Sequence, residues 1–301
     1  TQSRRADGTP SIMRRSDGAA ETLTSTRQDD RCPMPSLIYG TAWKKEDTAD
    51  LVVSAVKTGF RGIDTACQPK HYREDLVGEA IERLAAEGLR REALWVQTKF
   101  TPVFGHDPQS VPYNQHAAVA EQVAQSFEVS KKNLRTQFID CLLLHSPLES
   151  HRQNMEVWHA FEQLVQRSEV GHIGISNCYD LRVLRRLHAA ATIKPAVVQN
   201  RFYKDSQFDW KLRRWCSDHG VAYQGFWTLS ANRTTLRAPQ LLALARARRR
   251  TPEQTFFRFL LDEGIAPLIG TRSELHMHED LQVLHDDPLS GSAREEIWEM
   301  Y

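Results

Sequence analysis

From residue 37 onward, the chain alternates between short runs of apolar residues and longer segments with helical periodicity. Eight short runs have the length and apolar content of strands buried on both faces: 37–43, 62–66, 94–100, 139–145, 172–177, 196–202, 221–227 and 265–270. The segments between them place apolar residues on one helical face, and several end in glycine. Eight strands that are each followed by a helix predict an α/β fold, a single-domain (β/α)8 TIM barrel.

A doubly wound sheet is the alternative for an alternating chain, but no G-x-G-x-x-G follows the first strand. Lys and Arg number 39 and Asp and Glu 38, so we expect neither a nucleic-acid nor a membrane partner. No apolar run reaches the ~18 residues of a transmembrane helix. The five cysteines are odd in number and lack C-x-x-C spacing, which favours reduced thiols and a cytoplasmic location.

Residues 1–34 differ from the rest in composition. They are rich in Ser, Thr, Arg and Gly and show almost no apolar periodicity, so we expect a disordered N-terminal tail before a barrel domain at 35–301. The arginines of this segment hint at an organelle transit peptide, but its acidic residues argue against one.

Polar residues end the predicted strands one after another. Asp64 ends the second strand, Lys99 the third and His145 the fourth. Alone, each is more often a structural hydrogen-bonding residue than a catalyst. In a barrel, however, all strand ends converge on one mouth, where active sites lie. The succession therefore predicts a site there.

Lys99 carries the most information, because a lysine in an apolar strand is costly to bury unpaired. Asp64, one strand away, is its natural counter-ion. A lysine beside a phenol would lower the pKa of that phenol and make it a proton donor nearer neutral pH. His145 could donate a hydrogen bond to a carbonyl oxygen. This set suits the reduction of a carbonyl, with hydride supplied from elsewhere.

The loop after the third strand, residues 101–116, is unusually long for a connection in a barrel. Long loops at the carboxyl end of barrel strands are usually functional or mobile. Tyr113 in this loop is therefore a second candidate for the proton donor.

The motifs "GIDTA", "QTKF", "LLLHSP", "GISN", "VVQN" and "PLIGTRSELHMHEDL" follow one another between residues 37 and 285. In this order and spacing the chain resembles an aldo-keto reductase. The resemblance implies an NAD(P)(H)-dependent barrel without a metal, with Asp64, Tyr72, Lys99 and His145 as the catalytic tetrad. Tyr72 comes eight residues after Asp64, where five are usual in the family, and an insertion at "CQPK" accounts for the difference.

The resemblance also implies the residues that bind the cofactor. Ser176, Asn177 and Gln199 would bind the carboxamide, and Tyr223 would stack on the nicotinamide ring. The other residues implied at the cofactor are Gly40, Thr41, Asp64, Gly270, Thr271, Arg272, Glu279 and Asp280. Gly270 and His276 stand where many members carry Lys and Arg. A preference for NADPH, with NADH possible, would therefore rest on Arg272 and on a free helix N-terminus beside it.

We therefore expect an NADPH-dependent oxidoreductase that reduces aldehyde or ketone carbonyls of small molecules, with a monomer slightly favoured. One alternative is a nucleotide-binding regulatory barrel with little or no turnover, which the displaced Tyr72 keeps open. Another is a barrel lyase that uses Lys99 as a Schiff base.

Overall fold

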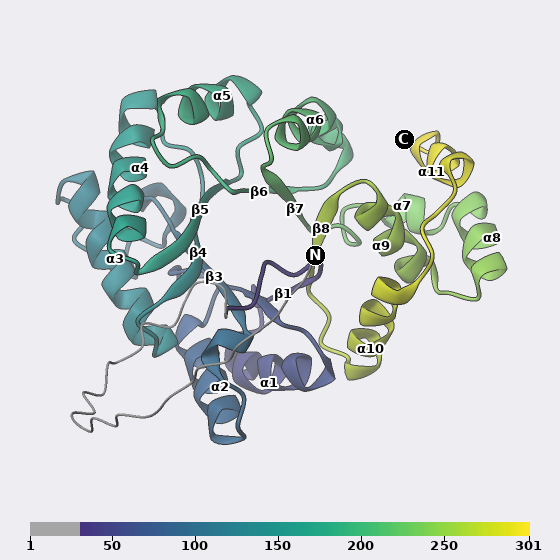
Figure 1. Ribbon diagram of the computed structural model, residues 1–301, viewed down its shortest axis with the longest axis horizontal. Helices are drawn as coiled ribbons and strands as arrows, with labels where there is room; N and C mark the ends of the chain where they lie inside the picture. The colour runs from purple at the N-terminus through teal and green to yellow at the C-terminus, as the bar shows by residue number, and fades with distance from the viewer. Residues whose placement is uncertain (1–30) are drawn as a thin grey trace, which may run out of the picture. The chain divides into compact units, whose positions relative to one another are not determined.

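The computed structural model describes residues 31–301, so most of the predicted tail lies outside the described residues. Each strand pairs in parallel with the next and β8 pairs with β1, which closes the barrel (Figure 1). The strands are β1 (Ile38–Gly40), β2 (Gly62–Asp64), β3 (Trp95–Phe100), β4 (Ile139–Leu144), β5 (Val170–Ser176), β6 (Val197–Arg201), β7 (Ala222–Phe226) and β8 (Ile265–Ile269). The predicted (β/α)8 barrel is confirmed.

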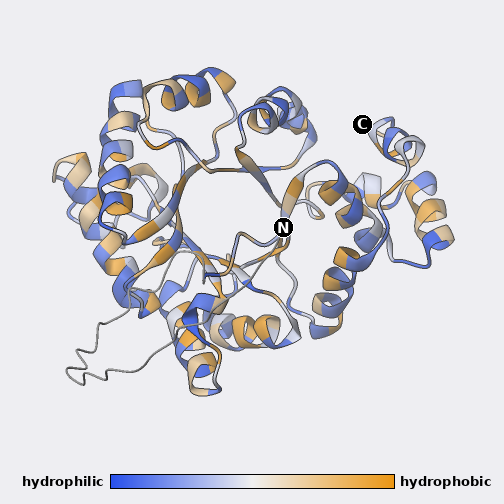
Figure 2. Cartoon of the chain, in the orientation of Figure 1, coloured by the Kyte–Doolittle hydropathy of each residue, from blue (hydrophilic) through white to orange (hydrophobic). Residues whose placement is uncertain are grey.

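Helices surround the strands and turn their apolar faces toward them (Figure 2). They are α1 (Thr48–Thr58), α2 (Glu74–Ala86), α3 (Val119–Leu134), α4 (His151–Gln166), α5 (Leu181–Ala190), α6 (Trp210–Asp218), α7 (Arg233–Leu236), α8 (Pro239–Arg248), α9 (Pro252–Asp262), α10 (Glu274–Gln282) and α11 (Gly291–Trp298). The short 3-10 helices of residues 31–301 are η2 (Lys45–Asp47), η3 (Arg91–Ala93), η4 (Val103–Gly105), η5 (Lys204–Asp209) and η6 (Val283–His285). Within residues 31–301, none of the helices could cross a membrane.

Local sequence sets the helix boundaries. In α4 and α9, reciprocal hydrogen bonds between the residue before the helix and its third residue form capping boxes (Ser150 with Gln153, Thr251 with Gln254). Gly59 ends α1 with φ +133°, a backbone conformation that favours glycine.

The segment that leads into β1 closes the N-terminal end of the barrel. Cys32 and Met34 pack on a cluster that includes Trp95 and Val197, the first residues of β3 and β6. The Nε2 atom of Gln224 lies 3.4 Å from the Met34 sulfur. These residues fall inside the predicted tail, and the structure shows instead that they belong to the barrel.

Candidate active site

Asp64 and Lys99 form an ion pair inside the barrel. Asp64 is the last residue of β2 and Lys99 the fifth of β3, and both are almost completely buried, at 2% and 1% exposed. The Lys99 ammonium donates to both carboxylate oxygens and to the Thr65 carbonyl, each at 2.7 Å. All three of its N–H groups are therefore used. The pairing predicted from the sequence is confirmed.

Three buried glutamines support the Asp64 carboxylate. Gln97 and Gln199 donate from Nε2 to Asp64 Oδ1 at 2.7 and 2.9 Å, and both also donate to Gln224 Oε1 at 2.8 and 2.9 Å. The carboxylate thus accepts four hydrogen bonds, which fixes its orientation. Sequence reasoning did not assign a role to Gln97, because it lies inside an apolar strand.

Tyr72 reaches this ion pair in spite of its unusual spacing. Its ring centroid lies 5.1 Å from Lys99 Nζ and 6.0 Å from the centroid of the His145 ring. The loop that carries Tyr72 is held against the loop after β3 by Gln68, whose Nε2 donates to the Gly105 carbonyl at 2.6 Å. The structure thus brings the four predicted tetrad residues together.

The electrostatic setting of Tyr72 differs from the sequence-based prediction. Burial raises the pKa of its hydroxyl above the usual range, and the negative charge of Asp64 adds to this effect. The expected lowering by Lys99 is not found, because Asp64 neutralises the lysine at contact distance. Tyr72 therefore holds its proton throughout the neutral pH range.

His145 follows β4 and faces Tyr72. Its Nδ1 lies 2.7 Å from the hydroxyl of Thr101. Burial lowers the pKa of His145 well below its usual value, and the charge of Lys99 acts in the same direction. The ring is therefore neutral and can donate only one N–H hydrogen bond.

Tyr113, the second candidate for the proton donor, does not present its hydroxyl to the tetrad. The side chain is buried, and its hydroxyl donates to the Thr101 carbonyl at 2.7 Å. The ring packs against Phe100 with centroids 5.5 Å apart. Tyr113 thus anchors the long loop after β3 to the barrel.

The three residues predicted to bind the carboxamide lie on neighbouring strands: Ser176 is the last residue of β5, Asn177 follows it, and Gln199 is the third residue of β6 and pairs with Ser176. The Ser176 hydroxyl donates to the Gln199 carbonyl at 2.7 Å, and Asn177 Nδ2 donates to the His145 carbonyl at 2.8 Å. Because Gln199 Nε2 makes two hydrogen bonds within the barrel, its Oε1 is left as an acceptor.

The predicted cofactor residues at the end of β1 have a structural role. Gly40 pairs with Asp64 in the sheet, and Thr41 donates to the Asp64 carbonyl from both its backbone nitrogen and its hydroxyl, at 3.0 and 2.9 Å. The Thr41 hydroxyl hydrogen is thus used to hold β1 against β2. Contact of either residue with a cofactor stays a prediction.

Lys44, which sequence reasoning missed, is a buried cation near the end of β8. It is 4% exposed, and its ammonium donates to the carbonyls of Gly270 and Thr271. Among the described residues it has no carboxylate partner within salt-bridge distance. Burial lowers the pKa of Lys44 to about 8, and the charge of Arg272 contributes. Lys44 stands in the charged stretch "WKKED", which has the composition of an exposed loop, so nothing in the sequence indicated a buried lysine.

The contacts of Arg272 and of the N-terminus of α10 differ from those predicted from the sequence. The guanidinium is exposed and pairs with Asp47 of η2. At the N-terminus of α10, the Ser273 hydroxyl accepts from the His276 backbone nitrogen at 3.4 Å, so one of the first N–H groups of the helix is already used. An anion there would have to compete with both contacts.

The two acidic residues predicted to bind the cofactor on α10, Glu279 and Asp280, differ in burial. Asp280 is 5% exposed, whereas Glu279 is only partly buried. Burial raises the pKa of Asp280 to about 7, and the charges of Glu279 and Glu253 add to it. Near neutral pH this carboxyl is therefore divided between its two protonation states.

The predicted stacking role of Tyr223 is not supported. Gln224 points into the barrel, so its neighbour Tyr223 points outward, since side chains alternate along a strand. The Tyr223 hydroxyl donates to Asp209 at 2.9 Å in a buried position. Phe226, two residues after Gln224 at the end of β7, faces the mouth instead.

Exposed aromatic side chains surround the mouth. They lie in the loops after alternate strands: Trp43, Phe104, Tyr179 and Trp227. The guanidinium of Arg201, the last residue of β6, lies 4.1 Å from the centroid of the Trp227 ring. We call these four aromatic residues the aromatic rim. It offers apolar surface to a ligand that enters the barrel mouth.

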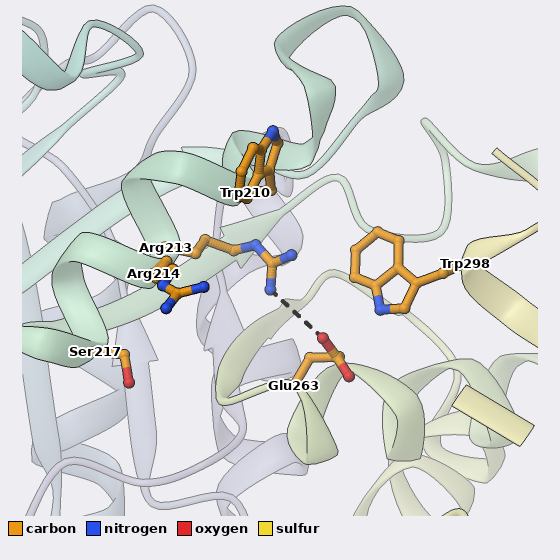
Figure 3. A pocket seen from close by; sticks show the side chains of 6 residues that line it. All are labelled: Trp210, Arg213, Arg214, Ser217, Glu263 and Trp298. Carbon is orange, nitrogen blue, oxygen red and sulfur yellow. Dashed lines mark ion pairs between the residues drawn. The ribbon is translucent and has the colours of Figure 1, made fainter. Parts of the chain in front are cut away.

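A cavity of about 340 Å³ lies between α6, the end of α9 and α11, away from the tetrad (Figure 3). Arg213 approaches Glu263 to 4.0 Å and lies 5.2 Å from the centroid of the Trp298 ring. The Arg213 Nε also donates to the Phe208 carbonyl at 2.9 Å. These contacts fix α11 to the barrel, and the cavity shares no lining residue with the tetrad.

The closed barrel and the similarity to known reductases define the class of protein, a (β/α)8 oxidoreductase. The chain belongs to the aldo/keto reductase family, whose sequence profile matches residues 36–301.

Known relatives agree with this assignment. The chain is 28% identical over 255 residues to a 9,11-endoperoxide prostaglandin H2 reductase of Trypanosoma cruzi, covering 83% of this chain and 82% of the relative. It is 26% identical over 306 residues to an NAD(P)H-dependent D-xylose reductase of Candida tropicalis, covering 88% and 89%. A crystal structure of an aldo/keto reductase from Brucella melitensis superimposes with a TM-score of 0.76 at 26% identity, covering 89% and 95%.

Proposed function

We propose that the protein reduces aldehyde or ketone carbonyls of small molecules with NADPH, with Tyr72 as the general acid. The observation that carries the proposal is the buried Asp64–Lys99 pair directly beside Tyr72 and His145. A buried ion pair adjoining a phenol and a neutral imidazole has the donors that a carbonyl oxygen needs.

Several residues fit a nicotinamide cofactor. Gln199 Oε1 is an acceptor for the carboxamide NH2, beside Ser176 and Asn177. Lys44 and Arg272 place two cations beside the segment after β8, which suits a phosphate group. We assign the preference for NADPH to these two cations. When bound, the cofactor supplies the hydride.

The chain's own residues then handle the carbonyl oxygen. His145 donates its single N–H hydrogen bond and orients the carbonyl, and Tyr72 gives its proton to the same oxygen. The alcohol so formed is a weaker acid than a phenol, so a raised pKa of Tyr72 still allows the transfer. Lys99 offsets part of the Asp64 charge, which would otherwise raise the pKa of the tyrosine still further.

The geometry favours this function over the alternatives. All three N–H groups of Lys99 are engaged, which leaves no free amine to form a Schiff base. Tyr72 lies beside the ion pair, so its displacement in the sequence gives no reason to expect a barrel without turnover. The aromatic rim favours carbonyl compounds with apolar or aromatic substituents. A cytoplasmic location and a monomeric state stay predictions.

The test is NADPH oxidation by the purified protein with a panel of aldehydes that includes 4-nitrobenzaldehyde. We expect turnover that is faster with NADPH than with NADH at equal low concentration. Binding of NADPH, seen as quenched tryptophan fluorescence, without reduction of any aldehyde would indicate the regulatory barrel instead. Absence of both binding and turnover would indicate unrelated chemistry.

A further inference from the structure

Thr101, the residue directly after β3, contacts a reactive side chain without being part of the tetrad. It is buried at 2% exposed, and its Oγ1 lies 2.7 Å from His145 Nδ1. We propose that Thr101 is a positioning residue that fixes the tautomer of His145 with the ring proton on Nε2. The inference rests on the proposed function, in which His145 donates a hydrogen bond to the carbonyl oxygen.

The direction of the hydrogen bond follows from counting donors. A threonine hydroxyl has one hydrogen to donate. Within residues 31–301, His145 Nδ1 is the one acceptor that the Thr101 hydroxyl meets. If the ring donated from Nδ1 instead, the hydroxyl hydrogen would be buried without a partner, which is unfavourable. The hydroxyl therefore donates to Nδ1, and the neutral ring carries its proton on Nε2.

The position of Thr101 is itself fixed by the long loop after β3. Its carbonyl accepts from the Tyr113 hydroxyl at 2.7 Å and from His106 Nε2 at 2.9 Å. These two bonds hold the backbone of Thr101 while its side chain holds the imidazole. The loop thus reaches His145 through Thr101.

The opposite edge of the His145 ring is available to a substrate. Nε2 makes no hydrogen bond to any residue from 31 to 301, nor is it among the fully buried unpaired atoms. The backbone of His145 is held on both sides, since its nitrogen donates to the Phe100 carbonyl at 2.9 Å and its carbonyl accepts from Asn177. With backbone and Nδ1 fixed, Nε2–H has a defined direction.

The test compares Thr101→Val, which keeps the shape and removes the hydroxyl, with Thr101→Ser, which keeps the hydroxyl. We expect kcat/KM for 4-nitrobenzaldehyde to fall about 10- to 100-fold in Thr101→Val, as for other residues that orient a functional histidine. NADPH affinity should not change, and Thr101→Ser should stay close to the wild type. A Thr101→Val enzyme with wild-type kcat/KM would overturn the inference.

A second readout depends neither on turnover nor on the Thr101 variants. Nitrogen-15 NMR of the wild-type protein, with the His145 signals assigned through His145→Gln, distinguishes the two neutral tautomers. We expect a protonated Nε2 and an unprotonated Nδ1 in the wild type. A proton on Nδ1 would contradict the role of Thr101. Absence of turnover together with the expected tautomer would contradict the proposed function alone.

Discussion

Replacing Lys99 by methionine tests how the barrel tolerates its internal charge. The change removes three hydrogen bonds and leaves the Asp64 carboxylate 2% exposed, with only Gln97 and Gln199 as side-chain donors. Breaking a buried ion pair by removing one partner costs about 3–5 kcal/mol. We therefore expect Lys99→Met to lose about this much free energy of unfolding at pH 8. Methionine fills a similar volume, so little of the loss comes from a cavity.

The pH dependence distinguishes an unpaired charge from lost packing. In the variant, the unpaired Asp64 carboxylate can become neutral by binding a proton. The loss of free energy of unfolding should therefore be smaller at pH 5 than at pH 8. The matched control is the double variant Asp64→Asn/Lys99→Met, which removes both charges and should recover most of the stability at pH 8. Turnover should stay low in both variants, because the charge pattern beside Tyr72 is lost.

Urea unfolding followed by tryptophan fluorescence at the two pH values measures these differences. Equal losses of Lys99→Met at pH 5 and pH 8, or a double variant no more stable than the single one, would refute the reasoning. A Lys99→Met enzyme with the wild-type rate would show that Lys99 has only a structural role.

Three further outcomes follow from the cofactor region and α10. Lys44→Met should weaken NADPH binding at least about 10-fold, measured by fluorescence quenching, because it removes the buried cation beside the segment after β8; unchanged affinity would contradict its role. Arg272→Ala should weaken NADPH about 10-fold and barely change NADH, since Asp47 already competes for the guanidinium; equal losses for both cofactors would contradict this. Asp280→Asn should stabilise the fold at pH 8, by at most about 4 kcal/mol, and leave its stability unchanged below pH 4. The reason is that the pKa of this carboxyl rises to about 7 on folding, so the wild-type fold loses stability as the pH rises through that value. Thermal unfolding at the two pH values measures this difference. Equal shifts of the melting temperature of Asp280→Asn relative to the wild type at both pH values would contradict the prediction.

The barrel could be predicted because its strands are buried on both faces and therefore appear as continuous apolar runs. The tetrad could be predicted because titratable residues that end such runs must converge at one mouth. The first strand was overestimated, since 37–43 was predicted and β1 is only Ile38–Gly40. The chain leaves the sheet after Gly40, and Trp43 and Lys45 then adopt positive φ angles, which a strand does not contain.

The errors have physical reasons as well. Tyr223 was chosen by residue type within a motif, although alternation along the strand sends it to the face opposite Gln224. The pKa of Tyr72 was assigned the wrong direction because the sequence shows a lysine but not how completely Asp64 neutralises it. Lys44 was missed because burial of a loop lysine depends on how the loops after β1 and β8 pack together, which periodicity does not report.

The central claim is that Tyr72 donates the proton, and the most direct measurement is turnover by Tyr72→Phe. The variant keeps the ring between Lys99 and His145 and removes only the hydroxyl. We expect kcat for the reduction of 4-nitrobenzaldehyde to fall about 10²- to 10⁴-fold, the range for loss of a general acid, while NADPH still quenches the protein fluorescence. The matched control is Tyr113→Phe, which should retain far more activity than Tyr72→Phe, because His106 still bonds the Thr101 carbonyl when the Tyr113 hydroxyl is removed. A Tyr72→Phe enzyme with the wild-type rate, above all beside an inactive Tyr113→Phe, would contradict the account.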